Sequence, residues 1–229
     1  AFSADDVAQL LSGLSANAAN RVAITYAANS YAFYVLQSNK ETSRAAYAQG
    51  LIKALGETEN KEDKAFILQM MKQVSKNEAI PALLPYLKDD YLLDKAALAL
   101  NAIRTPEAAQ ALSAALKDAA TEKETTALVA ALGDLRSKAD EDAILASLKK
   151  YDSENYQRTA FAALSKIAGE KSVPTLLAKL KAVGYRFEKT NIGGLTLDYA
   201  QNLLGEHRDR LAVSVANTVM KGATASGDI

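Results

Sequence analysis

An apolar motif that recurs at nearly constant spacing is the feature of this sequence that most restricts its fold. The motif begins at residues 51, 83, 112, 144 and 176, where the chain reads LIKALGE, LLPYLKD, LSAALKD, ILASLKK and LLAKLKA. The steps between these starts are 32, 29, 32 and 32 residues. A second series, formed by Met71, Leu100, Leu132 and Leu164, has steps of 29, 32 and 32 residues. Both series shorten at the same unit, which indicates internal repeats with one deletion in one loop.

Each repeat has the pattern of two amphipathic helices. The segment EAIPALLPYLKD (78–89) has apolar residues at positions i, i+3, i+4 and i+7, which form one stripe on an α-helix. The segment DKAALALNAI (94–103) forms a similar stripe. Neither helix can bury its stripe alone, so the sequence predicts helix pairs that stack on their neighbours.

The expected helix starts carry capping residues or a proline in the first turn. They are Thr105 with Pro106, Thr121 with Glu124 in a capping box, Ser153, and Ser172 ahead of Pro174. Pro85 lies inside a predicted helix, where it removes a backbone donor, and we expect the helix to bend there.

These motifs resemble the HEAT-repeat family, in particular its short bacterial, bilin-lyase-like form. The resemblance rests on a first helix that ends in LL-x-x-L-K-D and a second that reads A-A-x-A-L-x-x-I, with ALGDL at 131–135 as the closest match. It implies an all-α protein with a right-handed α-α superhelix, a HEAT/armadillo-like solenoid. The basic residue that many such repeats place early in the second helix is present as Lys95 and Arg158, but Thr126 stands at that position in the unit between them.

We expect one solenoid over residues 1–229, with three parts. Residues 1–42 form an N-terminal capping repeat whose segment YAANSYAFYVL (26–36) belongs to one long second helix, and residues 43–183 form the regular repeats of about 32 residues. Residues 184–229 begin with the glycine-bounded loop GYRFEKTNIGG (184–194) and continue as capping helices. Terminal repeats vary because they must cover an apolar face that would otherwise be exposed.

Composition excludes most catalytic and metal sites. The chain has 27 basic and 27 acidic residues, no cysteine, no tryptophan and a single histidine, His207. His207 has no patterned nucleophile beside it, and the pairs Asp89–Asp90 and Asp140–Glu141 fall where helix ends favour acids. We therefore expect no enzyme activity, no metal and no cofactor.

The enzymes that this family contains do not fit the sequence. HEAT-like alkylpurine DNA glycosylases depend on a basic groove with tryptophans beside an acidic residue, and the chain offers neither net positive charge nor tryptophan. Bilin lyases are a second precedent, but no residue suggests tetrapyrrole binding. No apolar run reaches the ~20 residues of a membrane span.

A non-catalytic binding scaffold is the function that the sequence favours. We expect the second helices to line a concave surface of mixed charge, which suits a protein or carbohydrate partner better than nucleic acid. The predicted contact residues are Lys72, Asn101, Arg104, Asp134, Arg136 and Lys166, with Tyr185, Arg186 and Phe187 in the loop. Two alternatives stay open: the helix residues are merely solvated, and Tyr185 and Phe187 fold back to plug the end of the stack. We expect a monomer.

The start of the chain and the HEAT units also resemble the amino-terminal region of exported Bacteroidetes proteins that carry a downstream domain of the 3-keto-disaccharide hydrolase type. This resemblance rests on the acidic start SADDVAQLLSGL (3–14). It implies an accessory domain of an exported carbohydrate-active enzyme as the alternative function. The start AFSADDV, without an initiator methionine, favours export over a cytoplasmic location.

Overall fold

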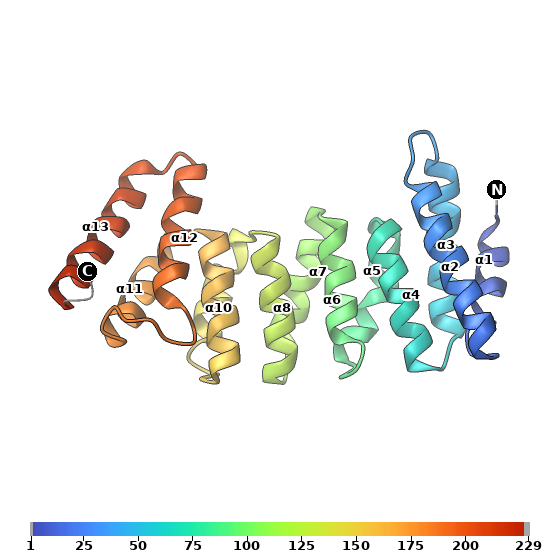
Figure 1. Cartoon of the computed structure of the whole chain (residues 1–229), viewed down its shortest axis with the longest axis horizontal. Helices are drawn as coiled ribbons and strands as arrows, with labels where there is room; N and C mark the ends of the chain where they lie inside the picture. The colour runs from blue at the N-terminus through green and yellow to red at the C-terminus, as the bar shows by residue number, and fades with distance from the viewer. Residues whose placement is uncertain (1, 227–229) are drawn as a thin grey trace. The chain divides into compact units, whose positions relative to one another are not determined.

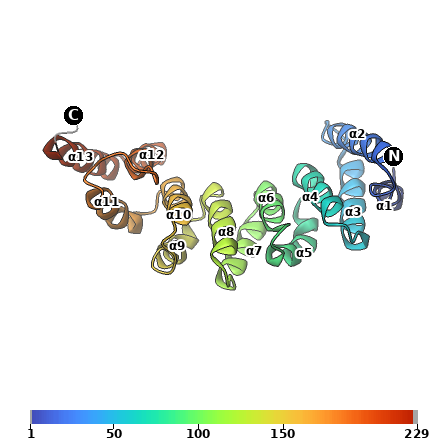
Figure 2. The ribbon, with the colours of Figure 1, turned by 60° about the horizontal axis from the view of Figure 1, so that its bottom comes forward.

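The computed structural model describes residues 2–226, and these residues form helices and no strand. The chain divides into two compact units, residues 1–115 and 116–229. Each unit consists of helix pairs whose members lie in two layers (Figure 2). The prediction of an all-α helical-repeat fold is confirmed.

The N-terminal unit stacks its helix pairs on the first helix of the chain. In Figure 2, α1, α3 and α5 lie in one layer, and α2, α4 and α6 lie in the other. α3 packs on α1 and on α4, and α4 packs on α6. The helices of this unit are α1 (Ala4–Leu11), α2 (Ala18–Val35), α3 (Glu41–Glu57), α4 (Lys61–Val74), α5 (Ile80–Leu83), α6 (Leu93–Ile103) and most of α7 (Pro106–Lys117), with 3₁₀ turns η1 (Asn77–Ala79) and η2 (Leu84–Lys88).

The C-terminal unit continues the same design and then departs from it. α8, α10 and α12 lie side by side (Figure 1), and α9 and α11 form the layer behind them. α13 packs on α12 and closes the unit. The helices are α8 (Glu122–Asp134), α9 (Glu141–Ser147), α10 (Glu154–Ile167), α11 (Val173–Ala182), α12 (Ile192–Gly205) and α13 (Asp209–Ser226), with 3₁₀ turns η3 (Lys138–Asp140) and η4 (Glu170–Ser172).

The apolar series read from the sequence forms the core of both units. Met71 and Leu100 are fully buried in the N-terminal unit, as are Leu132 and Leu164 in the C-terminal unit. Where the helix backbones come closest, the sequence has glycine. A Cβ atom on Gly50 would lie 2.5 Å from Val7 Cβ of α1, and one on Gly133 would lie 2.6 Å from Ala163 Cα of α10.

The three-residue deletion lies in a helix and not in a loop. The second helices α4, α8 and α10 begin ten residues before their core residue, as in Lys61 to Met71, whereas α6 begins at Leu93, seven residues before Leu100. α6 therefore lacks the first turn of the other second helices. It also lacks their side-chain N-cap, and Asp89 compensates because its Oδ1 accepts hydrogen bonds from the backbone N–H groups of Tyr91 (2.8 Å) and Leu92 (3.1 Å). The sequence alone led to a gap in the turn before α6. No side-chain N-cap marks the start of α6, so its start could not be aligned with those of the other second helices.

The other local predictions agree with the structure except at three places. Ser153 caps α10, and the helix at Pro85 changes from α to 3₁₀ geometry. Thr121 caps α8, but the capping box is incomplete, because the Glu124 carboxylate accepts from the Ala120 backbone N–H over 2.8 Å and not from that of Thr121. Ser172 makes no capping bond; instead, its backbone N–H and hydroxyl donate to Glu141 Oε1 over 2.8 and 2.6 Å. The loop after α11 ends at Asn191, so Gly193 and Gly194 belong to α12 and do not bound the loop.

The C-terminal ends of three second helices share an unusual backbone conformation. A positive φ occurs at the residue just after α6 and α10 and at the second residue after α8: 55° at Arg104, 52° at Ala168 and 54° at Arg136. These positions are 32 residues apart, so the conformation repeats with the sequence. A left-handed residue ends a helix sharply and turns the chain back, which allows the next first helix to pack on the layer behind.

Candidate binding groove in the C-terminal unit

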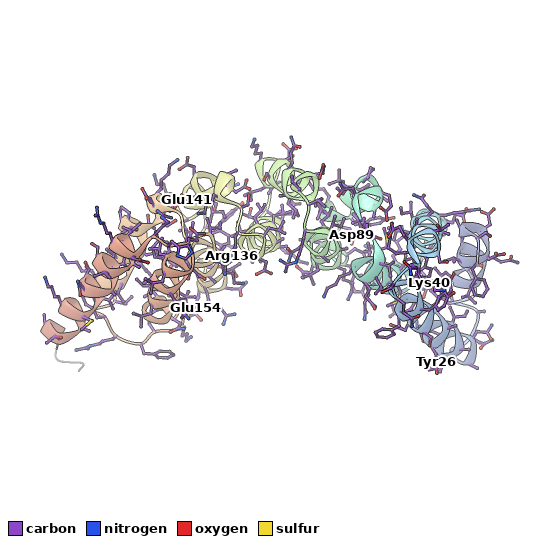
Figure 3. The ribbon with its side chains drawn as sticks, turned by 90° about the horizontal axis from the view of Figure 1, so that it is seen from above. Tyr26, Lys40, Asp89, Arg136, Glu141 and Glu154 are labelled. Carbon is purple, nitrogen blue, oxygen red and sulfur yellow. The ribbon has the colours of Figure 1, made fainter. Side chains whose placement is uncertain are left out.

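Three of the predicted contact residues come together at one place. Asp134 is the last residue of α8, Arg136 lies two residues beyond it, and Lys166 lies in the last turn of α10. All three side chains are exposed. Figure 3 labels Arg136, which lies on the side of the unit where α12 runs. The repeat brings these residues together because the ends of successive second helices lie beside each other.

A groove of about 490 Å³ lies beside these residues, along α10 and α12. Its lining is mostly polar and contains both signs of charge. The lining residues are Arg136, Ala162, Ser165, Lys166, Leu195, Asp198, Gln201, Asn202 and Gly205.

Hydrogen bonds and an ion pair hold the side chains along one edge of the groove. Arg136 Nη2 donates to Asn202 Oδ1 over 3.1 Å, and Asn202 Nδ2 donates to the carbonyl of Ser165 over 3.0 Å. Lys166 pairs with Asp134, one repeat earlier. Arg136 and Lys166 both lie at C-terminal helix ends, where the helix dipole favours positive charge. The rim thus presents oriented donors and acceptors rather than mobile side chains.

The structure adds residues that the sequence analysis missed. Asp198, Gln201 and Asn202 lie on α12, which is outside the regular repeats, so no periodic comparison pointed to them. Their spacing on one helix face was the available signal. Ser165 is 1% exposed below the groove, and its hydroxyl has no hydrogen-bond partner among the residues that the structure describes.

The remaining predicted helix residues lie elsewhere. Lys72 and Arg104 are exposed in the N-terminal unit. Asn101 differs from the expectation, because it is 8% exposed and belongs to the buried face of α6. It directly follows Leu100 in the sequence, and a helix whose neighbours cover a wide face buries such flanking positions as well.

The three loop residues have different environments. Tyr185 has a φ of 61° and is half-buried against the C-terminal core, with its ring on α13 at Gly222. Phe187 is 88% exposed, and Arg186 is exposed. The interpretation that both aromatic residues plug the end of the unit therefore holds for Tyr185 and is wrong for Phe187.

Glu188 holds the end of this loop against α12. It accepts hydrogen bonds from the backbone N–H groups of Thr190 (2.8 Å) and Ile192 (3.3 Å). Partial burial raises the pKa of its carboxyl, but these bonds and one from the Thr190 hydroxyl outweigh that effect, and the pKa is lowered. The loop next to Phe187 is thus anchored by a charged cap.

No constellation for catalysis or metal binding is found among residues 2–226. His207 is exposed in the turn between α12 and α13, with a φ of 60°. Asp89 accepts a hydrogen bond in a turn, and Asp140 accepts one from the Ser137 hydroxyl. Glu141 is buried and accepts a hydrogen bond from the Ser172 hydroxyl, so these acids have structural partners. The described part of the chain holds no group of three or more metal-ligating side chains and no helix long and apolar enough to cross a bilayer.

The comparison with protein families agrees with the helix pairs. Residues 48–133 match the model for HEAT repeats. This segment runs from α3 to α8 and contains the regular repeats of the N-terminal unit. No curated protein matches the chain. The bilin-lyase-like and Bacteroidetes resemblances, export from the cell, a monomeric state and the lack of catalysis stay predictions.

Proposed function

We propose that the chain is a non-catalytic scaffold that binds a protein partner, with the groove along α10 and α12 as its contact surface. HEAT repeats are commonly protein-interaction scaffolds. The observation that carries the proposal is the gathering of Asp134, Arg136 and Lys166 at the rim of a groove that α12 lines with further polar side chains.

The groove chemistry suits a polypeptide segment. The charges in its lining are of both signs, because Asp198 stands with Arg136 and Lys166, and Gln201 adds an amide that can pair with a peptide group. Among its lining residues there is no aromatic ring on which the C–H face of a sugar could stack. A protein partner is therefore favoured over a carbohydrate.

The loop before α12 supplies a second contact. Phe187 exposes 88% of its surface on a segment that Glu188 and Tyr185 anchor on either side. An exposed phenylalanine in a held loop can enter an apolar pocket of a partner at small entropic cost. Arg186 beside it adds a charged donor.

Site-specific photo-crosslinking tests the proposal. p-Benzoyl-phenylalanine is placed at Gln201 in the groove and, as a control, at Ala146, which is exposed on α9. In an extract of the source cells, we expect Gln201 to give a discrete protein adduct that Ala146 does not give. The adduct should disappear when Arg136→Ala and Lys166→Ala are combined, with the melting temperature unchanged. Equal adducts from both positions, an adduct that survives the double substitution, or a glycan in place of a protein would contradict the proposal.

A further inference from the structure

A second hollow lies in the N-terminal unit, between α1 and α2, and its chemistry is unlike that of the groove. Its volume is about 540 Å³, which is within the usual size range of small-molecule sites. Apolar and aromatic side chains dominate the lining. The lining residues are Phe2, Asp6, Val7, Gln9, Leu10, Ala27, Ala28, Tyr31 and Tyr47.

Aromatic rings form one wall of this cleft. Tyr31 contacts Phe2 edge-to-face, with the ring centroids 5.1 Å apart, and contacts Tyr47 in the same way at 5.2 Å. Tyr34 stacks on Tyr31 at 5.5 Å, and Lys40 Nζ lies 4.6 Å from the centroid of the Tyr34 ring. The cluster therefore already holds one ammonium group over an aromatic face.

The cleft carries one negative charge. Asp6 is the only ionisable carboxylate among the lining residues, and no lysine, arginine or histidine lines the cleft. Asp6 Oδ2 accepts hydrogen bonds from the Ser3 backbone N–H (2.9 Å) and the Ser3 hydroxyl (2.8 Å), and these bonds lower the pKa of the carboxyl. The carboxylate is thus ionised at neutral pH and held in one orientation at the edge of an aromatic surface.

The neighbouring basic side chains of α2 and α3 have other partners. Arg21 is the one charged residue of α2, and it pairs with Asp63. Lys53 of α3 pairs with Asp5, which adjoins Asp6 in sequence but does not line the cleft. Neither side chain is therefore an ion-pair partner of Asp6.

We propose that this cleft binds a small organic cation with an apolar body, such as an aryl-alkyl ammonium, with the ammonium group beside Asp6 and the hydrocarbon against Tyr31 and Leu10. Aromatic rings together with a carboxylate favour such a cation because its charge interacts with both. An anion would be repelled by Asp6, and a neutral analogue would gain the apolar contact alone. This site is independent of the groove on α10 and α12.

Three probes with the same phenyl-ethyl body and different charge test the charge selection. They are 2-phenylethylamine, 2-phenylethanol and 3-phenylpropionate, measured at pH 7 and low salt by calorimetry or by ligand-observed NMR on the whole chain. We expect the amine to bind about tenfold more tightly than the alcohol, and the acid to bind least. Equal affinities for the amine and the alcohol, or no binding of the amine, would overturn the proposal.

Paired substitutions locate the site. Asp6→Asn keeps an oxygen that can accept from Ser3 and removes the charge, so the amine should lose its tenfold advantage, while Asp5→Asn, with the same change of net charge, should keep it. Ala27→Leu fills the cleft from its edge and should abolish amine binding, whereas Ala23→Leu on the exposed surface of the same helix should not. If Asp5→Asn has the same effect as Asp6→Asn, or if Ala27→Leu leaves binding intact, the cleft is not the site.

Discussion

The N-terminal and C-terminal units are built from the same kind of helix pair. Their surface hollows, the cleft between α1 and α2 and the groove along α10 and α12, nevertheless differ in chemistry. The hollow of the N-terminal unit is aromatic and has a single charge, whereas the groove of the C-terminal unit is polar and contains charges of both signs. Both units bury the same series of apolar residues. The comparison teaches that the buried series can stay the same while the surfaces outside it differ in chemistry.

The buried series should be equally intolerant of charge in both units. We expect Leu100→Asp and Leu132→Asp each to reduce the free energy of unfolding by more than about 3 kcal/mol, because the carboxylate is buried with no partner. Leu98→Asp is the matched control, because Leu98 is 45% exposed on the same helix as Leu100, and its effect should be within about 0.5 kcal/mol. Urea denaturation measures all three. A similar loss for Leu98→Asp would show that the series does not form the core.

The close contacts between helices offer a second comparison of the units. Gly50→Ala and Gly133→Ala should each destabilise by about 1–3 kcal/mol, because the new methyl group meets α1 in one unit and α10 in the other. Gly56→Ala is the control on α3: a Cβ there has no atom within 4 Å, and alanine favours the helix, so stability should rise slightly. Thermal unfolding of the three variants measures the effect. Destabilisation by Gly56→Ala as well would point to the backbone and not to the helix contact.

Acid should weaken the N-terminal unit before the C-terminal one. Among the carboxyl groups of residues 2–226 whose pKa values are resolved as lowered, five lie in the N-terminal unit and one, Glu188, lies in the C-terminal unit; the five are Asp6, Glu41, Glu78, Asp89 and Glu107. Hydrogen bonds from Arg44 and Lys76 lower the pKa of Glu41 to about 2 from its ordinary 4.5. A lowered pKa means that the unfolded state binds more protons, so this stability is present above pH 4.5 and is lost as the pH falls towards 2.

Limited pepsin digestion at pH 3 measures this difference. We expect the first cleavages within residues 2–115, because at pH 3 the unfolded form of this unit binds protons that its native carboxylates with lowered pKa values do not bind, which favours unfolding. Replacing Glu41 and Glu78 by glutamine should make the N-terminal unit less stable at neutral pH, where Arg44 loses its charged partners, and less dependent on pH below 4.5. First cleavages within residues 116–226 would contradict the assignment.

The sequence predicted the features that periodicity controls. The helix pairs, the buried leucines and the meeting of Asp134, Arg136 and Lys166 all follow from a 32-residue repeat. What the sequence did not predict lies outside the repeat or depends on packing: Gln201 and Asn202 on α12, the burial of Asn101, and the missing first turn of α6. The aromatic cleft was missed because Phe2, Tyr31 and Tyr47 are far apart in sequence and meet through the contacts of α1, α2 and α3.

Arg136→Ala and Arg104→Ala should have the smallest effects on stability, and together they compare the two units in partner binding. Arg104 and Arg136 occupy the same left-handed position at the ends of α6 and α8, but Arg136 reaches Asn202 at the groove. Arg136→Ala should change the free energy of unfolding by only about 0.5 kcal/mol, because one exposed hydrogen bond is lost and the backbone keeps its conformation. The same change at Arg104 should cost a similar amount. If the groove binds the partner, Arg136→Ala should lower the yield of the Gln201 adduct, and Arg104→Ala should leave it unchanged. An equal loss of adduct in the two variants would mean that the partner contacts the repeated left-handed position and not the groove.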